Sequence, residues 1–179
     1  MGDSYRRIRN TLRFFFFFLS DIPATGDLPT TDGKTFNWNA IVAEIERNDH
    51  VWATQHDLLP LDRWIIEQTE LLAEDCMRAY SDYDFGTAIS AIHNFCADQL
   101  SSFYLDAIKD RMYCDGTDWN TRRSGQIASR QVLLNLTKLV APILAHTAEE
   151  VWQRVPGLIN EPDSVHMTQI SRPTASRLE

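Results

Sequence analysis

The longest helical pattern in the sequence runs from Asp84 to Tyr113 and reads DFGTAISAIHNFCADQLSSFYLDAIKDRMY. Its apolar side chains recur every three or four residues, and they are Phe85, Ala88, Ile89, Ile92, Phe95, Cys96, Leu100, Phe103, Ala107, Ile108 and Met112. This spacing predicts an α-helix, because a strand would alternate apolar and polar residues. Asp84 is expected to cap the N-terminus of the helix. The apolar stripe is too wide for a helix surrounded by water, so the helix needs neighbours on at least two sides.

Three further long helices and one short helix are predicted around it. Apolar residues at helical spacing place the long ones at about residues 4–19, 59–80 and 124–140, and Pro142 is expected to end or kink the last. The T-x-x-E sequence from Thr147 to Glu150 predicts a capping box that opens a short helix reaching Trp152. The predicted fold class is therefore all-α, a helical bundle of four main helices plus a short fifth.

The bundle is expected to form one domain over residues 1–157, followed by an irregular tail at residues 158–179. Within this domain, residues 20–56 form a loop-rich insertion, since residues 20–36 are rich in Pro, Gly, Asp and Thr. A short amphipathic helix is predicted at residues 40–47. In the tail, Ser164 to Met167 is predicted as a strand.

The composition indicates a globular chain with no general affinity for polyanions. The formal net charge is −8, whereas proteins that bind nucleic acid indiscriminately carry a large positive field. A local basic face is still compatible with this charge. Cys76 and Cys96 lie on apolar helical faces, which favours buried thiols in a reducing, cytoplasmic compartment over a disulfide. The apolar run Phe14–Leu19 is too short to cross a membrane, which takes about 20 apolar residues.

The sequence offers no arrangement typical of a catalytic centre. It contains no glycine-rich phosphate loop and no set of nucleophile, base and orienting residue. His146 stands near Glu149 and Glu150, but the order is not that of a metal-binding helix and the predicted capping box accounts for both acids. His93 falls in the apolar stripe and is expected in the core. We therefore expect no catalytic residue and no metal ligand in this chain.

Basic and aromatic residues offer the better candidates for function. Arg6, Arg9, Asn10 and Arg13 share the polar side of the first helix, and Phe17 continues that side by one turn. Guanidinium forks and an amide suit phosphates and RNA bases, and an aromatic ring suits stacking. Two more basic patches are predicted, and they consist of Lys109 and Arg111 beside Tyr113, and of Arg122, Arg123 and Arg130.

Two alternatives remain open at this point. The arginines could instead pair with the abundant acidic residues. The five successive phenylalanines, Phe14 to Phe18, cannot all face one core, so they are covered by a second layer or presented to a partner. A helical module that docks on another protein through this first helix is the alternative function.

Four segments carry a family resemblance. They are YRRIRNTLRF (5–14), LDRWII (61–66), SDYDFGTAISAIHNFCADQLSSFYLDAIKDRMY (81–113) and LTKLVAPILAHTAEEVW (136–152). In this order and spacing they resemble the anticodon-binding domain of the isoleucyl-tRNA synthetases, which are class Ia aminoacyl-tRNA synthetases. The phenylalanine run and the length of residues 20–56 depart from the family pattern.

The resemblance implies a function in tRNA recognition. Enzymes of this family join isoleucine to its tRNA with ATP and magnesium, and their HIGH-like and KMSKS-like motifs and editing domain are not in this sequence. The chain would hold the anticodon stem and loop of the tRNA, with the catalytic and editing domains of the parent enzyme as further partners and no membrane. A C-terminal zinc module is common in the family, but this chain has no zinc-ligand spacing. The residues expected to bind tRNA are Arg6, Arg9, Asn10, Arg13, Phe17, Lys109 and Arg111.

Overall fold

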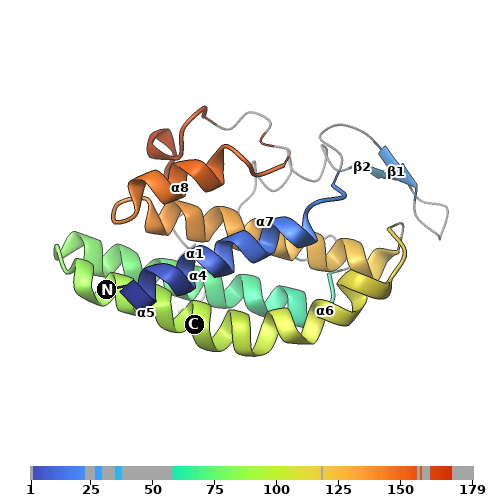
Figure 1. The fold of residues 1–179 in the computed structure, drawn as a ribbon, viewed down its shortest axis with the longest axis horizontal. Helices are drawn as coiled ribbons and strands as arrows, with labels where there is room; N and C mark the ends of the chain where they lie inside the picture. Colours follow the sequence, from blue (N-terminus) through green and yellow to red (C-terminus); the bar gives the residue numbers. More distant parts are fainter. Residues whose placement is uncertain are drawn as a thin grey trace, which may run out of the picture.

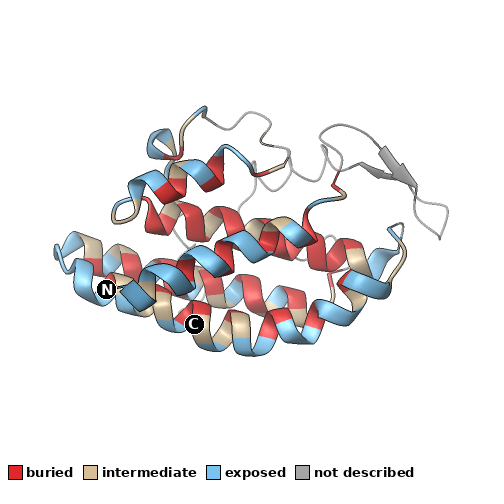
Figure 2. Ribbon diagram, in the orientation of Figure 1, coloured by how far each residue is buried: buried red, intermediate tan, exposed pale blue. Residues whose placement is uncertain are grey.

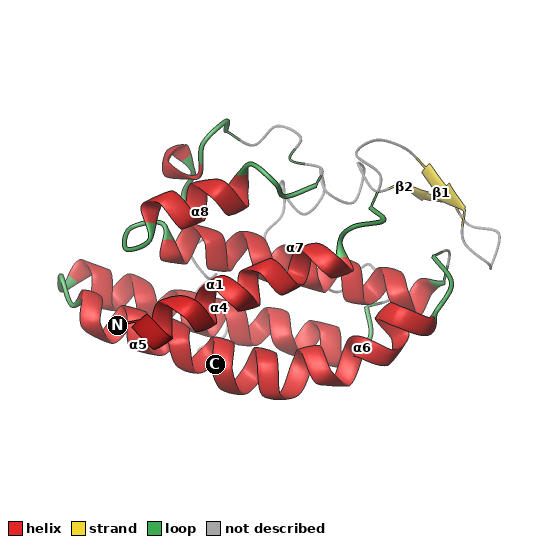
Figure 3. Cartoon of the chain, viewed as in Figure 1, coloured by secondary structure: helices red, strands yellow, loops and turns green. Residues whose placement is uncertain are grey.

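The structure is a computed structural model that describes residues 2–22, 27–29, 35–37, 58–117, 119–156, 158 and 162–170. Helices dominate it, as Figure 3 shows. In chain order the elements are α1 (Gly2–Phe18), β1 (Asp27–Pro29), β2 (Thr35–Asn37), α4 (Pro60–Ser81), α5 (Phe85–Asn94), the π-helix η1 (Phe95–Tyr104), α6 (Leu105–Cys114), α7 (Asn120–Val140), α8 (Ala145–Trp152) and the 3₁₀-helix η2 (Val165–Met167).

The predicted helix at residues 84–113 exists, but its middle third is wider than an α-helix. The segments α5, η1 and α6 follow one another without a break, since Phe95 and Leu105 at the junctions both keep helical backbone angles. We call these three segments together the long helix. Asp84 caps it as predicted, because its carboxylate accepts the backbone N–H of Thr87 at 3.0 Å. The helical bundle expected from the sequence is thereby confirmed in the described residues.

The π-helical turns change which residues face the core. Helical spacing predicted Phe103 and Ala107 as core residues, yet both are exposed, and Tyr104 and Leu105 are buried in their place. A π-helix bonds residue i to residue i+5, so the side chains that follow are rotated relative to an α-helix. The hydroxyl of Ser102 donates to the carbonyl of Ala97, five residues back, at 2.7 Å.

The long helix, α4 and α7 form the centre of the bundle. A short turn returns the chain from α4 to α5, so the two helices are packed neighbours, and α7 packs on α4 and α6. Gly125 allows the close approach of α6 to α7, because a Cβ there would lie 3.0 Å from the sulfur of Met112. The sequence predicted α7 from Ser124, four residues later than its observed start. It ends at Val140, directly before Ala141 and Pro142, as expected.

Helix α1 crosses the front of this centre and lies between the long helix and α8, with contacts to α5, η1, α7 and α8 (Figure 1). Figure 2 shows the burial that results, with buried residues on the inward faces of the helices. Within the phenylalanine run, Phe15 and Phe18 are buried, Phe16 is half-buried, and Phe14 and Phe17 are exposed. The run is therefore divided between the core and the surface. Phe18 is only 1% exposed and is a core residue.

The C-terminal part of the bundle differs from the sequence predictions in two places. The capping box at Thr147 is wrong: α8 begins at Ala145, no side chain caps it, and the Thr147 hydroxyl faces the hydroxyl of Tyr5 at 3.5 Å. The strand at Ser164–Met167 is also wrong, because Val165–Met167 form the 3₁₀-helix η2. This short helix packs on α8, with Val165 buried. Trp152 is buried as well, and its indole N–H donates to the carbonyl of Pro162 at 3.0 Å.

Residues 20–36 were predicted as a loop, and the structure adds an antiparallel hairpin there, with Leu28 opposite Phe36. The helix predicted at residues 40–47 lies outside the described residues. Cys76 and Cys96 are buried free thiols, as predicted, and burial raises the pKa of each to about 12. None of the described helices is both long enough and apolar enough to span a membrane.

Candidate nucleic-acid interface

The outward face of α1 carries a row of polar and cationic side chains. Arg6, Arg9, Asn10 and Arg13 are all exposed. Within the described part of the chain, the three arginines have no ion pair and Asn10 has no side-chain hydrogen bond. The alternative that these arginines pair with acidic residues is thus not what the described structure shows. Their guanidinium donors are available to a ligand with phosphate or carbonyl oxygens.

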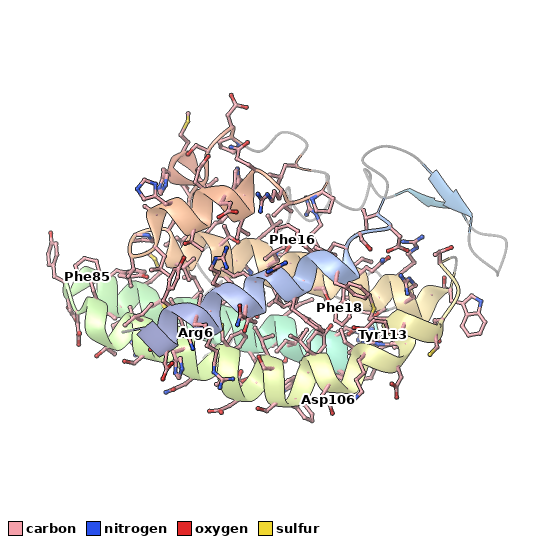
Figure 4. All side chains as sticks on the ribbon, viewed as in Figure 1. Arg6, Phe16, Phe18, Phe85, Asp106 and Tyr113 are labelled. Carbon is pink, nitrogen blue, oxygen red and sulfur yellow. The ribbon has the colours of Figure 1, made fainter. Side chains whose placement is uncertain are left out.

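An aromatic cluster lies at the C-terminal end of this face. Phe17 is 55% exposed and Tyr113 is 54% exposed, and their ring centroids are 5.2 Å apart. The buried ring of Phe18 supports both, with centroids 6.4 Å from Phe17 and 6.2 Å from Tyr113. Figure 4 shows Phe18 and Tyr113 next to each other where α1 meets α6. Two rings that are half in water and held from behind offer faces on which a base can stack.

A groove of about 880 Å³ runs between α1 and the long helix. The α1 side contributes Arg6, Arg7 and Asn10, and the long helix contributes His93 and Lys109, with Tyr113 at the end. Figure 4 labels Arg6 and Asp106 on the two sides of the groove. The amine of Lys109 is 2.7 Å from the Asp106 carboxylate, which raises the pKa of Lys109. Three cations and two carboxylates, Asp3 and Asp106, therefore line the groove.

His93 corrects a sequence prediction. It was expected in the core, but it is only half-buried and lines the groove, with Nδ1 3.4 Å from the side-chain oxygen of Asn94. Sequence reasoning also missed Arg7 and Phe14, since both lie beside the polar stripe of α1 and not on it. They belong to the site only because α1 lies along the long helix.

Arg111 was predicted to contact tRNA, but its side chain is only 14% exposed and is bonded within the protein. Its guanidinium forms two hydrogen bonds with the fully buried carboxylate of Asp62, one of them at 2.9 Å. Tyr104 and Ser124 also donate to this carboxylate, the former at 2.8 Å. Burial and the neighbouring Asp62 raise the pKa of Tyr104 well above its usual range. Because its donors are used within the protein, Arg111 is a scaffold residue that joins α6 to α4.

The third predicted basic patch is likewise internal. Arg123 and Arg130 are buried, where Arg123 donates to Gln126 and Arg130 to the carbonyl of Pro156. Arg122 forms an ion pair with Asp21 at 3.2 Å and donates to the carbonyl of Met112. Since Asp21 follows α1 and Met112 precedes Tyr113, Arg122 holds the ends of α1 and α6 together.

The acids near His146 serve the fold. Glu149 accepts from the Gln153 amide and the Ser164 hydroxyl at 2.8 Å each and from the Val165 backbone N–H at 3.2 Å. These donors lower its pKa. No cluster of three His, Cys, Asp or Glu side chains suited to a metal ion occurs among the described residues.

Of the seven predicted contact residues, five lie on α1, Lys109 lies across the groove, and Arg111 is bonded to Asp62. Cations along a groove and exposed rings at its end are features that proteins binding single-stranded nucleic acid combine.

Comparison with known proteins defines the family. The profile described as "Anticodon-binding domain of tRNA ligase" matches residues 62–178, and the chain belongs to this family. The isoleucine–tRNA ligase of Syntrophotalea carbinolica is 39% identical over 178 residues, which are 99% of this chain and 16% of that protein. One from Pseudomonas fluorescens is 43% identical over 160 residues, covering 89% of this chain and 14% of the relative. The isoleucine–tRNA ligase of Hahella chejuensis is 40% identical over 156 residues, which cover 87% of this chain and 14% of that protein.

The resemblance found in the sequence is thereby confirmed, and the chain spans about 14–16% of the length of these relatives. Neither the family match nor the relatives support the alternative of a protein-docking module.

Proposed function

We propose that this chain binds the anticodon stem and loop of an isoleucine-accepting tRNA within an isoleucine–tRNA ligase. It would position the tRNA for ATP-dependent aminoacylation, which takes place in a catalytic region outside this chain. The observation that carries the proposal is the face of α1, where Arg6, Arg9 and Arg13 have no ion pair in the described residues and lead toward the exposed rings of Phe17 and Tyr113.

Each side chain type has a distinct part in the proposal. The arginines bind phosphate oxygens, which fixes the register of the RNA and makes the affinity depend on salt. Asn10 has an amide that can both donate to and accept from a base edge. Phe17 stacks on an unpaired base, a contact that is typically worth about 1–3 kcal/mol. Lys109 contributes a further positive charge from the opposite side of the groove.

The parent enzyme supplies the chemistry. ATP and magnesium are expected in its catalytic region, and a C-terminal module of the kind common in the family could hold zinc. None of these cofactors takes part in the RNA contacts proposed for this chain. The catalytic and editing domains would be neighbours in the same protein, and the cytoplasm is the compartment in which this assembly would work.

A titration of the chain with a fluorescent transcript of an isoleucine-accepting tRNA at two salt concentrations tests the proposal. We expect binding that weakens steeply with salt, because each phosphate contact to a single strand contributes a slope of about −0.7 in log K against log salt. Arg9→Ala is compared with Arg78→Ala as the matched control, since Arg78 is an exposed arginine on α4 and not on the face of α1. Binding that is unaffected by salt, or equally affected by both substitutions, would contradict the proposal.

A further inference from the structure

We infer that the groove between α1 and the long helix receives the sugar–phosphate backbone of an unpaired RNA strand, with Arg7, Lys109 and Ser101 as contacts and Tyr113 stacking on a base. The inference rests on the proposed function and adds to it the path of the strand. The exposed ridge of α1, with Arg9 and Arg13, then lies beside this path, because neither residue lines the groove.

The walls of the groove suit a chain of phosphates. Arg7 is exposed and has no ion pair in the part of the chain that the structure describes. Across the groove, Lys109 is exposed and held by Asp106 alone among the described ion pairs. A phosphate approaching Lys109 takes the place of that carboxylate, which is itself in water. The three cations outnumber the two carboxylates among the residues that line the groove, although the whole chain carries −8 and Asp110 also lies near Lys109.

The floor of the groove suits a ribose. Thr11 and Ser101 face each other across the contact of α1 with η1, with hydroxyl oxygens 3.4 Å apart. The Thr11 hydroxyl donates to the carbonyl of Arg7 at 3.0 Å, so the Ser101 hydroxyl must be the donor between the two. The oxygen of Ser101 is then left as an acceptor in the groove, beside the apolar side chain of Leu105. An acceptor next to an apolar surface can hold a 2′-hydroxyl, which distinguishes RNA from DNA.

The end of the groove explains why the strand must be unpaired. Tyr113 lines the groove and lies against Phe17, with both rings half exposed. Aromatic rings stack on the face of a base, and in a duplex that face is already covered by the neighbouring bases. A loop can turn a base onto Tyr113 while its backbone lies between α1 and the long helix.

Removal of a negative charge from the groove gives the sharpest test, because damage to the fold cannot increase affinity. Asp106→Asn frees Lys109, and Asp75→Asn frees Arg78 from an exposed ion pair of the same spacing on α4, so both substitutions raise the net charge by one. The probe is a fluorescent RNA hairpin that carries the anticodon stem and loop. We expect Asp106→Asn to bind about threefold to fivefold tighter at low salt, and Asp75→Asn to bind as the unchanged chain does. Equal effects of the two substitutions would overturn the inference.

Substitutions on the two sides of α1 separate the groove from the ridge. Arg7→Gln is expected to weaken hairpin binding about fivefold and to reduce the salt slope by about 0.7, while leaving the weak binding of the closed stem duplex unchanged. Arg9→Gln is the matched ridge variant. If Arg9→Gln weakens the hairpin and Arg7→Gln does not, the strand follows the ridge and the inference fails while the proposed function stands. If the unchanged chain binds no RNA at low salt, the proposed function fails as well.

The ribose contact has its own readout. The unchanged chain is expected to prefer the RNA hairpin over a DNA hairpin of the same sequence, and Ser101→Ala is expected to reduce that preference. An RNA preference that survives Ser101→Ala, or no preference in the unchanged chain, would remove Ser101 from the site.

Discussion

Tyr83 has a backbone conformation that its side chain disfavours. It lies in the turn between α4 and α5 with a positive φ of 57°. Its N–H donates to the carbonyl of Tyr80 at 3.1 Å, and the N–H of Asp84 donates to that of Ala79 at 2.8 Å. This is the hydrogen-bond pattern of a Schellman motif, whose left-handed position usually holds glycine. The cost comes from the Cβ atom, because left-handed angles bring it close to the carbonyl oxygen.

Tyr83→Gly is therefore expected to stabilise the chain. The side chain is 82% exposed, so little packing is lost, and relief of the left-handed strain should raise the free energy of unfolding by about 0.5–1 kcal/mol. Urea unfolding followed by circular dichroism measures it. Asp82→Gly is the matched control, since Asp82 has φ of −90° and a glycine there only adds freedom to the unfolded chain. A Tyr83→Gly protein no more stable than Asp82→Gly would contradict this account of the turn.

Asp62 is the second residue with a large expected effect. It is fully buried and accepts hydrogen bonds from Arg111, Tyr104 and Ser124, so it joins α4 to the long helix and to α7. Asp62→Ala would leave the Arg111 guanidinium without its buried partner, which typically costs about 3–5 kcal/mol. Asp75→Ala breaks an exposed ion pair and should cost less than about 1 kcal/mol. Urea unfolding distinguishes the two, and similar losses would show that the Asp62 network is not a structural anchor.

The residue scale also shows where sequence reasoning stops. Arg111 was assigned to RNA because Lys109 and Tyr113 stand beside it in the sequence. Its partner Asp62 lies 49 residues away, and no local pattern indicates that distance. Arg6, Arg9 and Arg13, by contrast, were placed on the surface correctly, because the periodicity of a single helix is enough to give its outward face.

At the scale of elements, local rules predicted which segments are helical and failed where packing intervened. The spacing of apolar residues predicted nearly the full lengths of α4 and α7, and Asp84 predicted the start of the long helix. Spacing did not predict the π-helix η1. An α-helix explains the apolar residues up to Leu100 equally well, and the two helix types differ only in which side chains after Leu100 are buried. At α8, the T-x-x-E motif predicted the wrong start of the helix. The turn at Ala141–Leu144 directly precedes α8, which begins at Ala145, so Thr147 lies inside the helix and does not cap it.

The contact between α8 and η2 should depend on pH through Glu149. Hydrogen bonds from Gln153 and Ser164 are the main causes that hold the pKa of Glu149 below its ordinary value of 4.5. Because the pKa is lowered in the folded state, the contact contributes its full stability above pH 4.5. It loses this stability as the pH falls through the lowered pKa. The N–H of Val165, which donates to this carboxylate, reports the change.

We expect the amide resonance of Val165 to shift below pH 4.5 in an NMR titration, and Glu149→Gln to abolish the shift. Glu150→Gln is the control, because Glu150 pairs with Arg154 at 2.8 Å and makes no contact with η2 in the described structure. A Val165 shift that persists in Glu149→Gln would assign the transition to another group.

At the scale of the whole molecule, the site exists because of how two helices cross. Sequence periodicity gave the outward face of α1 and, separately, the basic end of the long helix. It did not give the groove, since Arg7, Phe14 and His93 come together only when α1 lies along the long helix. An acidic chain with a net charge of −8 can still attract RNA here, because salt screens the distant acids over about 10 Å while the groove cations stay close to the ligand.

The same geometry predicts how a defect on α1 would appear in the parent ligase. Arg13 is an exposed residue of α1 without an ion pair in the described structure, so under the proposed function its loss removes one RNA contact without disturbing the core. Arg13→Ala in that enzyme is expected to weaken tRNA binding by about 1 kcal/mol, or roughly fivefold, measured as a higher KM for tRNA in aminoacylation. Formation of the aminoacyl-adenylate, measured by pyrophosphate exchange without tRNA, should be unchanged, because the anticodon-binding region takes no part in it. Arg154→Ala, an exposed arginine at the end of α8, is the control. An unchanged KM for tRNA would show that Arg13 does not contact tRNA, and a fall in pyrophosphate exchange would show that the substitution acts through the fold of the enzyme.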